Sequence, residues 1–232
     1  MTVQPETLSG RLETVRAGVA EAMSAAGRRH NDITLIVVTK FHPDTLVREL
    51  HGLGVRDFGE NRHQDAAPKA AALADLDLRW NFVGQLQSKK TRAVLEYARV
   101  LHSVDRASVI DAITAATAGD GSGRIDAFIQ LNLTDDPARG GVAPSEVESL
   151  TERVLQSPGI TLAGVMAVAP LGVDPRSAFA TVRAASERVR TLAPDASGLS
   201  MGMSADYREA ILEGATHLRI GTAITGNRPD AG

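Results

Sequence analysis

The stretch Ile33-Thr34-Leu35-Ile36-Val37-Val38-Thr39 decides the fold, and Lys40 directly follows it. It is almost wholly apolar and rich in β-branched side chains. Strands of a parallel sheet have this composition, because helices cover both faces of the sheet. We therefore expect a buried parallel strand at 33–39, with Lys40 at its carboxyl end.

Short apolar runs alternate with helical patterns along the rest of the chain. Apolar residues three and four apart predict a helix at 7–29, before the first strand. Further strands are predicted at 55–58, 80–83, 100–103, 127–133, 162–168, 198–201 and 217–220. Helices are predicted between them at 45–51, 62–73, 88–98, after the N-cap Asp105, after Pro144, and at 176–192 and 205–213. The α/β pattern favours a single (β/α)8 TIM-type barrel with an extra N-terminal helix, and a doubly wound open sheet is the alternative.

Composition limits the possible functions. We expect one domain over 1–232, divided into an N-terminal helix (1–30), a barrel (31–226) and a tail (227–232). Without cysteine there is no disulfide or thiolate chemistry, and the six histidines show no metal-ligand spacing. A net charge of −3 gives no case for nucleic-acid binding. The sequence shows neither a membrane-spanning run nor a secretory signal, so a cytoplasmic protein is expected.

Polar residues follow the predicted strands, where a barrel carries its function. Lys40 could form a Schiff base if burial at the strand end desolvated its amine, although a solvated lysine is more common at such a position. After the second strand, Gly59 would permit a tight turn, and Glu60 and Asn61 could face the barrel mouth. Asn61 could equally cap the next helix. Lys89 and Lys90 are interpreted as a solvated face.

The loops after the seventh and eighth strands have the composition of a phosphate site. In this fold, phosphate commonly binds there, because glycines let backbone N–H groups approach an anion and hydroxyls add donors. The residues that supply these groups are Ser200, Gly202, Ser204, Gly221 and Thr222. Arg219 lies within an apolar strand, where an unpaired cation is costly. We therefore expect Arg219 to pair with a carboxylate or to face a bound ligand.

In order and spacing, the motifs resemble those of the pyridoxal phosphate (PLP) homeostasis protein family, small PLP-binding proteins similar to the N-terminal barrel of bacterial alanine racemase. The resemblance covers nearly the whole chain. Its landmarks are VVTK at 37–40, FGEN at 58–61, WNFVGQLQSKK at 80–90, HSVD at 102–105, QLNL at 130–133, LSMGMS at 199–204 and RIGTAI at 219–224.

The resemblance implies PLP as cofactor and a role for each motif. It implies that Lys40 forms the Schiff base, that Arg219 lies near the pyridine nitrogen, and that Asn61 lies beside the ring. The implied phosphate-binding residues are Ser200, Ser204, Gly221 and Thr222. No catalytic residue is implied. The chain departs from the family pattern at Asn81 (usually His), at Lys89 (usually Asn) and at Arg139-Gly140-Gly141 (usually Lys-x-Gly).

The residues are consistent with three functions. The favoured one is a non-catalytic PLP carrier that keeps free PLP low and passes it to apo-enzymes. The alternative is a PLP-dependent amino-acid racemase, which needs a base on each face of its substrate. In alanine racemase one base is a tyrosine of a partner subunit, and here only Tyr97 and Tyr207 are available. The chain also stops shortly after the eighth strand, so a monomer with an open mouth is expected. A Schiff-base aldolase acting on a sugar phosphate is the third possibility.

Overall fold

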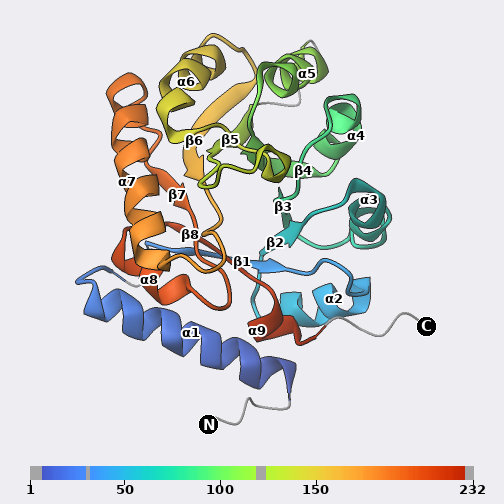
Figure 1. Ribbon diagram of the computed structural model, residues 1–232. Coiled ribbons are helices and arrows are strands. Elements are labelled where there is room, and N and C mark those ends of the chain that lie inside the picture. Colours follow the sequence, from blue (N-terminus) through green and yellow to red (C-terminus); the bar gives the residue numbers. More distant parts are fainter. Residues whose placement is uncertain (1–6, 30–31, 119–123, 228–232) are drawn as a thin grey trace.

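Eight parallel strands close into a barrel in chain order, as the alternating pattern predicts (Figure 1). Strand β1 pairs with both β2 and β8, and the ladder Val37 to Ile220 joins the first strand to the last. This closure rules out the open-sheet alternative. The strands are β1 Thr34–Val38, β2 Asp57–Glu60, β3 Arg79–Phe82, β4 Ala98–Val104, β5 Ile125–Gln130, β6 Ile160–Met166, β7 Gly198–Ser200 and β8 His217–Ile220.

Helices surround the strands in the computed structural model, which describes residues 7–29, 32–118 and 124–227. Most of the predicted tail, at 228–232, lies outside these residues. None of the helices described is long and apolar enough to cross a membrane. The helices are α1 Leu8–Ala25, α2 Asp44–Gly52, α3 His63–Ala72, α4 Thr91–Leu95, α5 Ala107–Thr117, α6 Val147–Leu155, α7 Pro175–Leu192, α8 Tyr207–Leu212 and α9 Thr222–Thr225, with 3-10 turns η1 Ser88–Lys90, η2 Pro137–Arg139 and η3 Pro144–Glu146.

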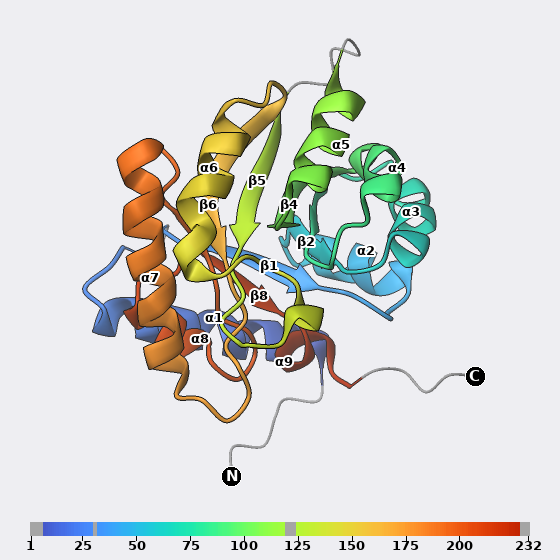
Figure 2. The ribbon, with the colours of Figure 1, turned by 45° about the horizontal axis from the view of Figure 1, so that its top comes forward.

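The N-terminal helix α1 packs against the last helices of the chain. Figures 1 and 2 both show α1 lying along α8 and α9, outside the strands. The Arg11 Nε donates to the Ile224 carbonyl at 2.7 Å, and the Arg28 Nη1 donates to the Ala215 carbonyl at 2.7 Å. Near the middle of α1, Arg16 donates to the carbonyl of Leu53, just after α2. Helix α1 therefore fills the outer ring between α8 and α2.

The apolar core has two parts, one on each side of the strands. A large cluster joins the strands to the helices and includes Ala127 and Ile129. A small, separate cluster contains Val100, Phe128 and Met166. Side chains alternate along a strand, so Phe128 points away from the side that Ala127 and Ile129 occupy. The small cluster therefore lies inside the barrel.

Two local predictions are wrong. Strand β2 begins two residues later than predicted, so Gly59 and Glu60 pair with β3 within the sheet instead of forming a turn. A Cβ at Gly59 would lie 3.1 Å from side-chain atoms of Ile36 and Val38, so this glycine permits close packing. Asp105 does not cap α5. Its carboxylate instead accepts from the side chain of Arg106, the N-cap residue, and from the Gly141 backbone N–H.

Candidate functional site

A cavity of about 470 Å³ opens at the carboxyl ends of the strands. The loops that follow a barrel's strands meet at this face, which is where barrel enzymes hold their ligands. Six of the seven predicted site residues line it, namely Lys40, Asn61, Ser204, Arg219, Gly221 and Thr222. Its apolar wall includes Val38, Val83 and Met166. The fold thus brings together residues that are far apart in the sequence.

Lys40 reaches the cavity from the end of β1, but its side chain is exposed. This exposure matches the solvated lysine that is more common at such a position. The next residue, Phe41, has a φ of 69°, a left-handed conformation that side chains other than glycine rarely adopt. Its ring lies 6.0 Å from the Lys40 Nζ and 5.4 Å from the Arg62 guanidinium. The backbone is therefore strained directly after the lysine, a feature that clusters at functional sites.

A buried ion pair is hydrogen-bonded to the end of β1, at the residue before Lys40. The Lys69 Nζ lies 2.5 Å from the Glu60 Oε1 and donates to the Thr39 carbonyl at 3.0 Å. The Thr39 hydroxyl also donates to the Glu60 Oε1, at 2.8 Å. Glu60 is 1% exposed, so the prediction that it faces the barrel mouth is wrong. The pair instead fixes the carbonyl of the residue that precedes Lys40.

Asn61 lines the cavity from the end of β2. Its side-chain oxygen is buried and has no hydrogen-bond partner within the described part of the chain. It does not cap α3, because Arg62 is the N-cap residue of that helix. Across the cavity wall, Gly84 approaches Asn61 so closely that a Cβ there would clash with the Asn61 carbonyl. Asn61 therefore offers a buried acceptor to a ligand with a suitably placed donor.

Two hydroxyls meet at the lip of the cavity between β7 and β8. The Ser204 Oγ accepts from the Ala223 backbone N–H at 3.2 Å and from the Thr222 hydroxyl at 3.3 Å. Gly202 precedes this turn with a φ of 93°. The Asp206 carboxylate accepts from the Met203 backbone N–H at 2.6 Å and so fixes the loop. These hydroxyls are groups suited to bind a phosphate.

Arg219 is buried in β8, and its guanidinium lines the cavity floor. It donates to the Ser200 Oγ at 2.7 Å and to the Ala167 carbonyl at 2.8 Å. Within the residues described, no carboxylate forms an ion pair with it. Burial lowers the pKa of Arg219 to about 10, against the opposing effect of Asp206, so it is charged at neutral pH. A buried, unpaired cation that faces a cavity fits the expectation of a bound ligand.

Ser200 lies apart from the other predicted residues. It is fully buried inside the barrel, where its hydroxyl contacts Arg219 and the ring of His102, and it does not line the cavity. His102 and Asn81 hydrogen-bond to each other at 3.1 Å. Neither residue was predicted to belong to the site. The signal available for them was a buried polar residue in an apolar strand, the same signal that pointed to Arg219.

Neither tyrosine of the chain lines the cavity. The Tyr207 hydroxyl packs directly against Gly18 of α1, on the outer side of the barrel. The Tyr97 ring stacks on His63 with 6.0 Å between centroids, and burial, followed by the charge of Glu60, raises the pKa of its hydroxyl. Neither tyrosine is therefore placed at the cavity to serve as the second base of a racemase.

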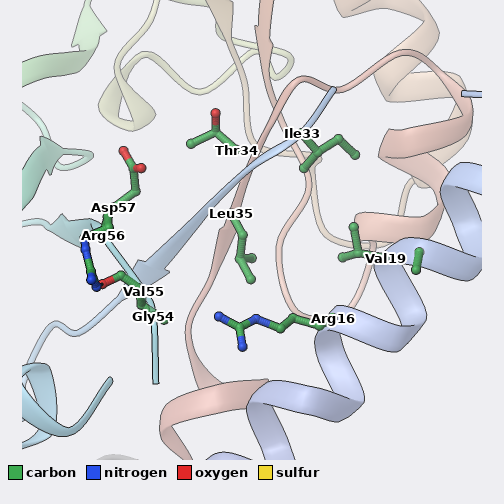
Figure 3. A pocket seen from close by; sticks show the side chains of 10 residues that line it. Arg16, Val19, Ile33, Thr34, Leu35, Gly54, Val55, Arg56 and Asp57 are labelled. Atoms are coloured by element: carbon green, nitrogen blue, oxygen red, sulfur yellow. The ribbon is translucent and has the colours of Figure 1, made fainter. Parts of the chain in front are cut away.

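A second cavity, of about 430 Å³, lies between α1 and the amino ends of β1 and β2 (Figure 3). Its two arginines already have partners. Arg16 bonds Glu13 and the Leu53 carbonyl, and Arg56 bonds the His51 and Val55 carbonyls. This cavity holds none of the predicted site residues, so the cavity at the carboxyl ends is the candidate site.

Comparisons with known proteins show the family to which the chain is similar. Residues 12–229 match the family model of the alanine racemase N-terminal domain. A pyridoxal phosphate homeostasis protein of Pseudomonas aeruginosa is 40% identical over 226 residues, which cover 96% of each chain. A protein of the same name from Mycobacterium leprae is 38% identical over 232 residues, covering 93% of this chain and 90% of the other.

A solved structure has the same architecture. PipY of Synechococcus elongatus, determined with PLP bound, superposes with a TM-score of 0.83. It is 33% identical, and the match covers 95% of this chain and 100% of that chain. The fold is thus shared along nearly the whole chain.

Proposed function

Because this chain belongs to the pyridoxal phosphate homeostasis protein family, we propose that it binds PLP as a Schiff base on Lys40 and releases it to apo-enzymes in the cytoplasm. One observation carries the proposal. Lys40, Arg219 and the Ser204–Thr222 hydroxyl pair, which come from the two ends of the chain, converge on one cavity. A primary amine, a fixed cation and a cluster of hydroxyl donors match the aldehyde, ring and phosphate of PLP.

The residues present fit such a group, and each has a distinct task. Lys40 supplies the amine that forms and breaks the covalent bond. Ser204, Gly221 and Thr222 bind the phosphate at the lip, while Asn61 offers its unpartnered oxygen beside the ring. PLP supplies an electron sink when it is bound. A guanidinium donates a hydrogen bond but does not give up its proton, so Arg219 keeps the ring nitrogen unprotonated and weakens that sink.

Two observations favour the carrier over a racemase. The Tyr207 hydroxyl lies against Gly18, and half-buried Tyr97 stacks on His63, so neither lines the cavity to act on the second face of a substrate. Lys40 is also exposed, which suits exchange of the cofactor with solvent. A sequestered active site would instead exclude water around the reacting atoms. The sugar-phosphate aldolase shares the lysine and the phosphate site, but the family to which the chain belongs does not favour it.

The test is a visible spectrum of the purified protein with PLP, followed by borohydride reduction and peptide mass analysis. We expect an absorbance band and a pyridoxyl group on Lys40. Lys40→Ala should lose the band, and Lys89→Ala, which removes an exposed lysine outside the cavity lining, should keep it. Absence of the band in the wild type, or labelling scattered over other lysines, refutes PLP binding at Lys40.

The carrier role has a separate test. The loaded protein should restore the activity of an apo PLP enzyme, and the borohydride-reduced protein should not. Turnover of an amino acid at ordinary enzyme rates, about 1–1000 per second, would refute the carrier role and favour the racemase.

A further inference from the structure

A line of hydrogen bonds crosses the barrel interior and ends at Arg219. It begins at Asp57 in β2, whose Oδ1 lies 3.2 Å from the Asn81 Nδ2 in β3. The Asn81 Oδ1 lies 3.1 Å from the His102 Nε2 in β4. The His102 Nδ1 lies 2.9 Å from the Ser200 Oγ in β7, which accepts from Arg219 in β8 at 2.7 Å.

Chemistry fixes the direction of every bond in this line. The Asn81 amide nitrogen faces the Asp57 carboxylate and the Arg79 carbonyl, both of which only accept, so the amide oxygen must face His102. The His102 Nε2 must then carry the hydrogen, and the Nδ1 must accept. The Ser200 hydroxyl therefore donates to the Nδ1 and turns a lone pair towards Arg219.

The surroundings hold the line in place. Three of its members, His102, Ser200 and Asn81, are at most 2% exposed. The Phe128 ring stacks on His102 with 4.6 Å between centroids and 9° between planes, which fixes the plane of the imidazole. Burial, followed by the charge of Arg219, lowers the pKa of His102 well below its usual value, so the ring stays neutral.

We propose that Asn81 and His102 are positioning residues that orient the Ser200 hydroxyl and thereby hold the Arg219 guanidinium in the cofactor cavity. This inference rests on the proposed binding of PLP. The buried guanidinium has a hydroxyl and a carbonyl as its hydrogen-bonded partners. A hydroxyl whose hydrogen is fixed on His102 presents only its acceptor side, so it stabilises the cation better than one free to rotate. Ser200 thus acts from behind Arg219, inside the barrel.

The experiment measures the rate of PLP dissociation into an excess of trapping apo-enzyme. His102→Phe keeps an aromatic ring for the stack but removes both nitrogens, and Ser200→Ala removes the hydroxyl. Ser200→Ala loses a hydrogen bond to a charged group and should speed dissociation about tenfold. His102→Phe keeps that bond but loses the orientation of the hydroxyl, so it should also speed dissociation, by a smaller factor. His102→Asn places an amide oxygen near the position of the Nδ1 and should recover most of the slower rate. Val100→Ala, which shortens an apolar side chain of the same small cluster without a polar change, should shift the unfolding temperature with little effect on the rate.

The double variant decides whether His102 acts through Ser200. If it does, His102→Phe with Ser200→Ala should release PLP no faster than Ser200→Ala alone. Rate increases that multiply would overturn the inference, as would a rate for His102→Phe equal to that of the wild type.

A second measurement does not depend on PLP. The ¹⁵N NMR shifts of His102 in the unloaded protein should report a protonated Nε2 and a bare Nδ1. The opposite tautomer would overturn the inference even if PLP binds at Lys40. A wild type that shows the expected tautomer but no visible band would instead refute the proposed function.

Discussion

Replacing Lys69 by Met should destabilise the protein severely, because the ion pair below Lys40 is buried on both sides. The two side chains are 7% and 1% exposed. The substitution removes the bonds to Glu60 and to the Thr39 carbonyl, and leaves a buried carboxylate with only the Thr39 hydroxyl. Breaking a buried pair in this way costs about 3–5 kcal/mol. That is a large part of the ~5–15 kcal/mol that stabilises a typical domain.

Unfolding in urea, followed by circular dichroism, measures the loss directly, and the midpoint of thermal unfolding should fall by about 10 °C. Adding Glu60→Gln should recover part of the stability, since the uncompensated charge is then gone. Arg153→Met is the matched control, because it breaks a pair with Asp111 that is about half exposed on both sides and should change stability by less than about 1 kcal/mol. A loss below about 1 kcal/mol for Lys69→Met, or a double variant less stable than the single one, would contradict this reasoning.

Two further predictions concern pH and the cavity wall. Burial, then the charges of Arg79 and Arg219, lowers the pKa of His217 from 6.5 to about 4, so the unfolded chain binds a proton more readily than the native protein. The contribution of His217 to stability should therefore be full above pH 6.5 and fall as the pH drops towards 4, by about 2 kcal/mol between pH 7 and pH 5, and buried His102 should add to this loss. Urea unfolding at both pH values measures this, and His217→Gln should flatten the dependence; an unchanged slope would assign the effect to other groups. Gly84→Ala should weaken PLP binding about tenfold, because the new Cβ clashes with the Asn61 carbonyl and displaces that residue. Gly52→Ala, where nothing lies within 4 Å of the new Cβ, should bind as the wild type does in the same spectral titration.

The barrel was predictable from the sequence because its strands are buried on both faces. Such strands form continuous apolar runs, and the run at His217–Ile220 was placed with its exact limits. The predicted range of strand β2 was two residues too early, because the second half of the strand, Gly59 and Glu60, is neither apolar nor β-branched. Those residues join the sheet because the neighbouring ladders and the partner Lys69 satisfy them, which a local pattern does not reveal.

The candidate site was predictable where a residue reaches the cavity from the end of a strand. Lys40 and Asn61 follow this rule, Arg219 was found instead as a cation within an apolar strand, and all three line the cavity. Ser200 does not line the cavity. It is the last residue of β7, and its side chain points into the barrel, where it hydrogen-bonds to His102. Which face of a strand end a side chain takes depends on register against its neighbours.

Closure of the barrel by its first and last strands has a consequence for biosynthesis. Lys40 follows β1 and leaves the ribosome early, whereas Arg219 and Thr222 belong to β8 and the turn after it. Helix α1, the first of the helices described, packs against α9, the last of them. A nascent chain therefore carries its reactive amine long before it has a place for the phosphate. Capture of the cofactor must wait for the final strand, so a truncated or stalled product has the lysine but not the pocket.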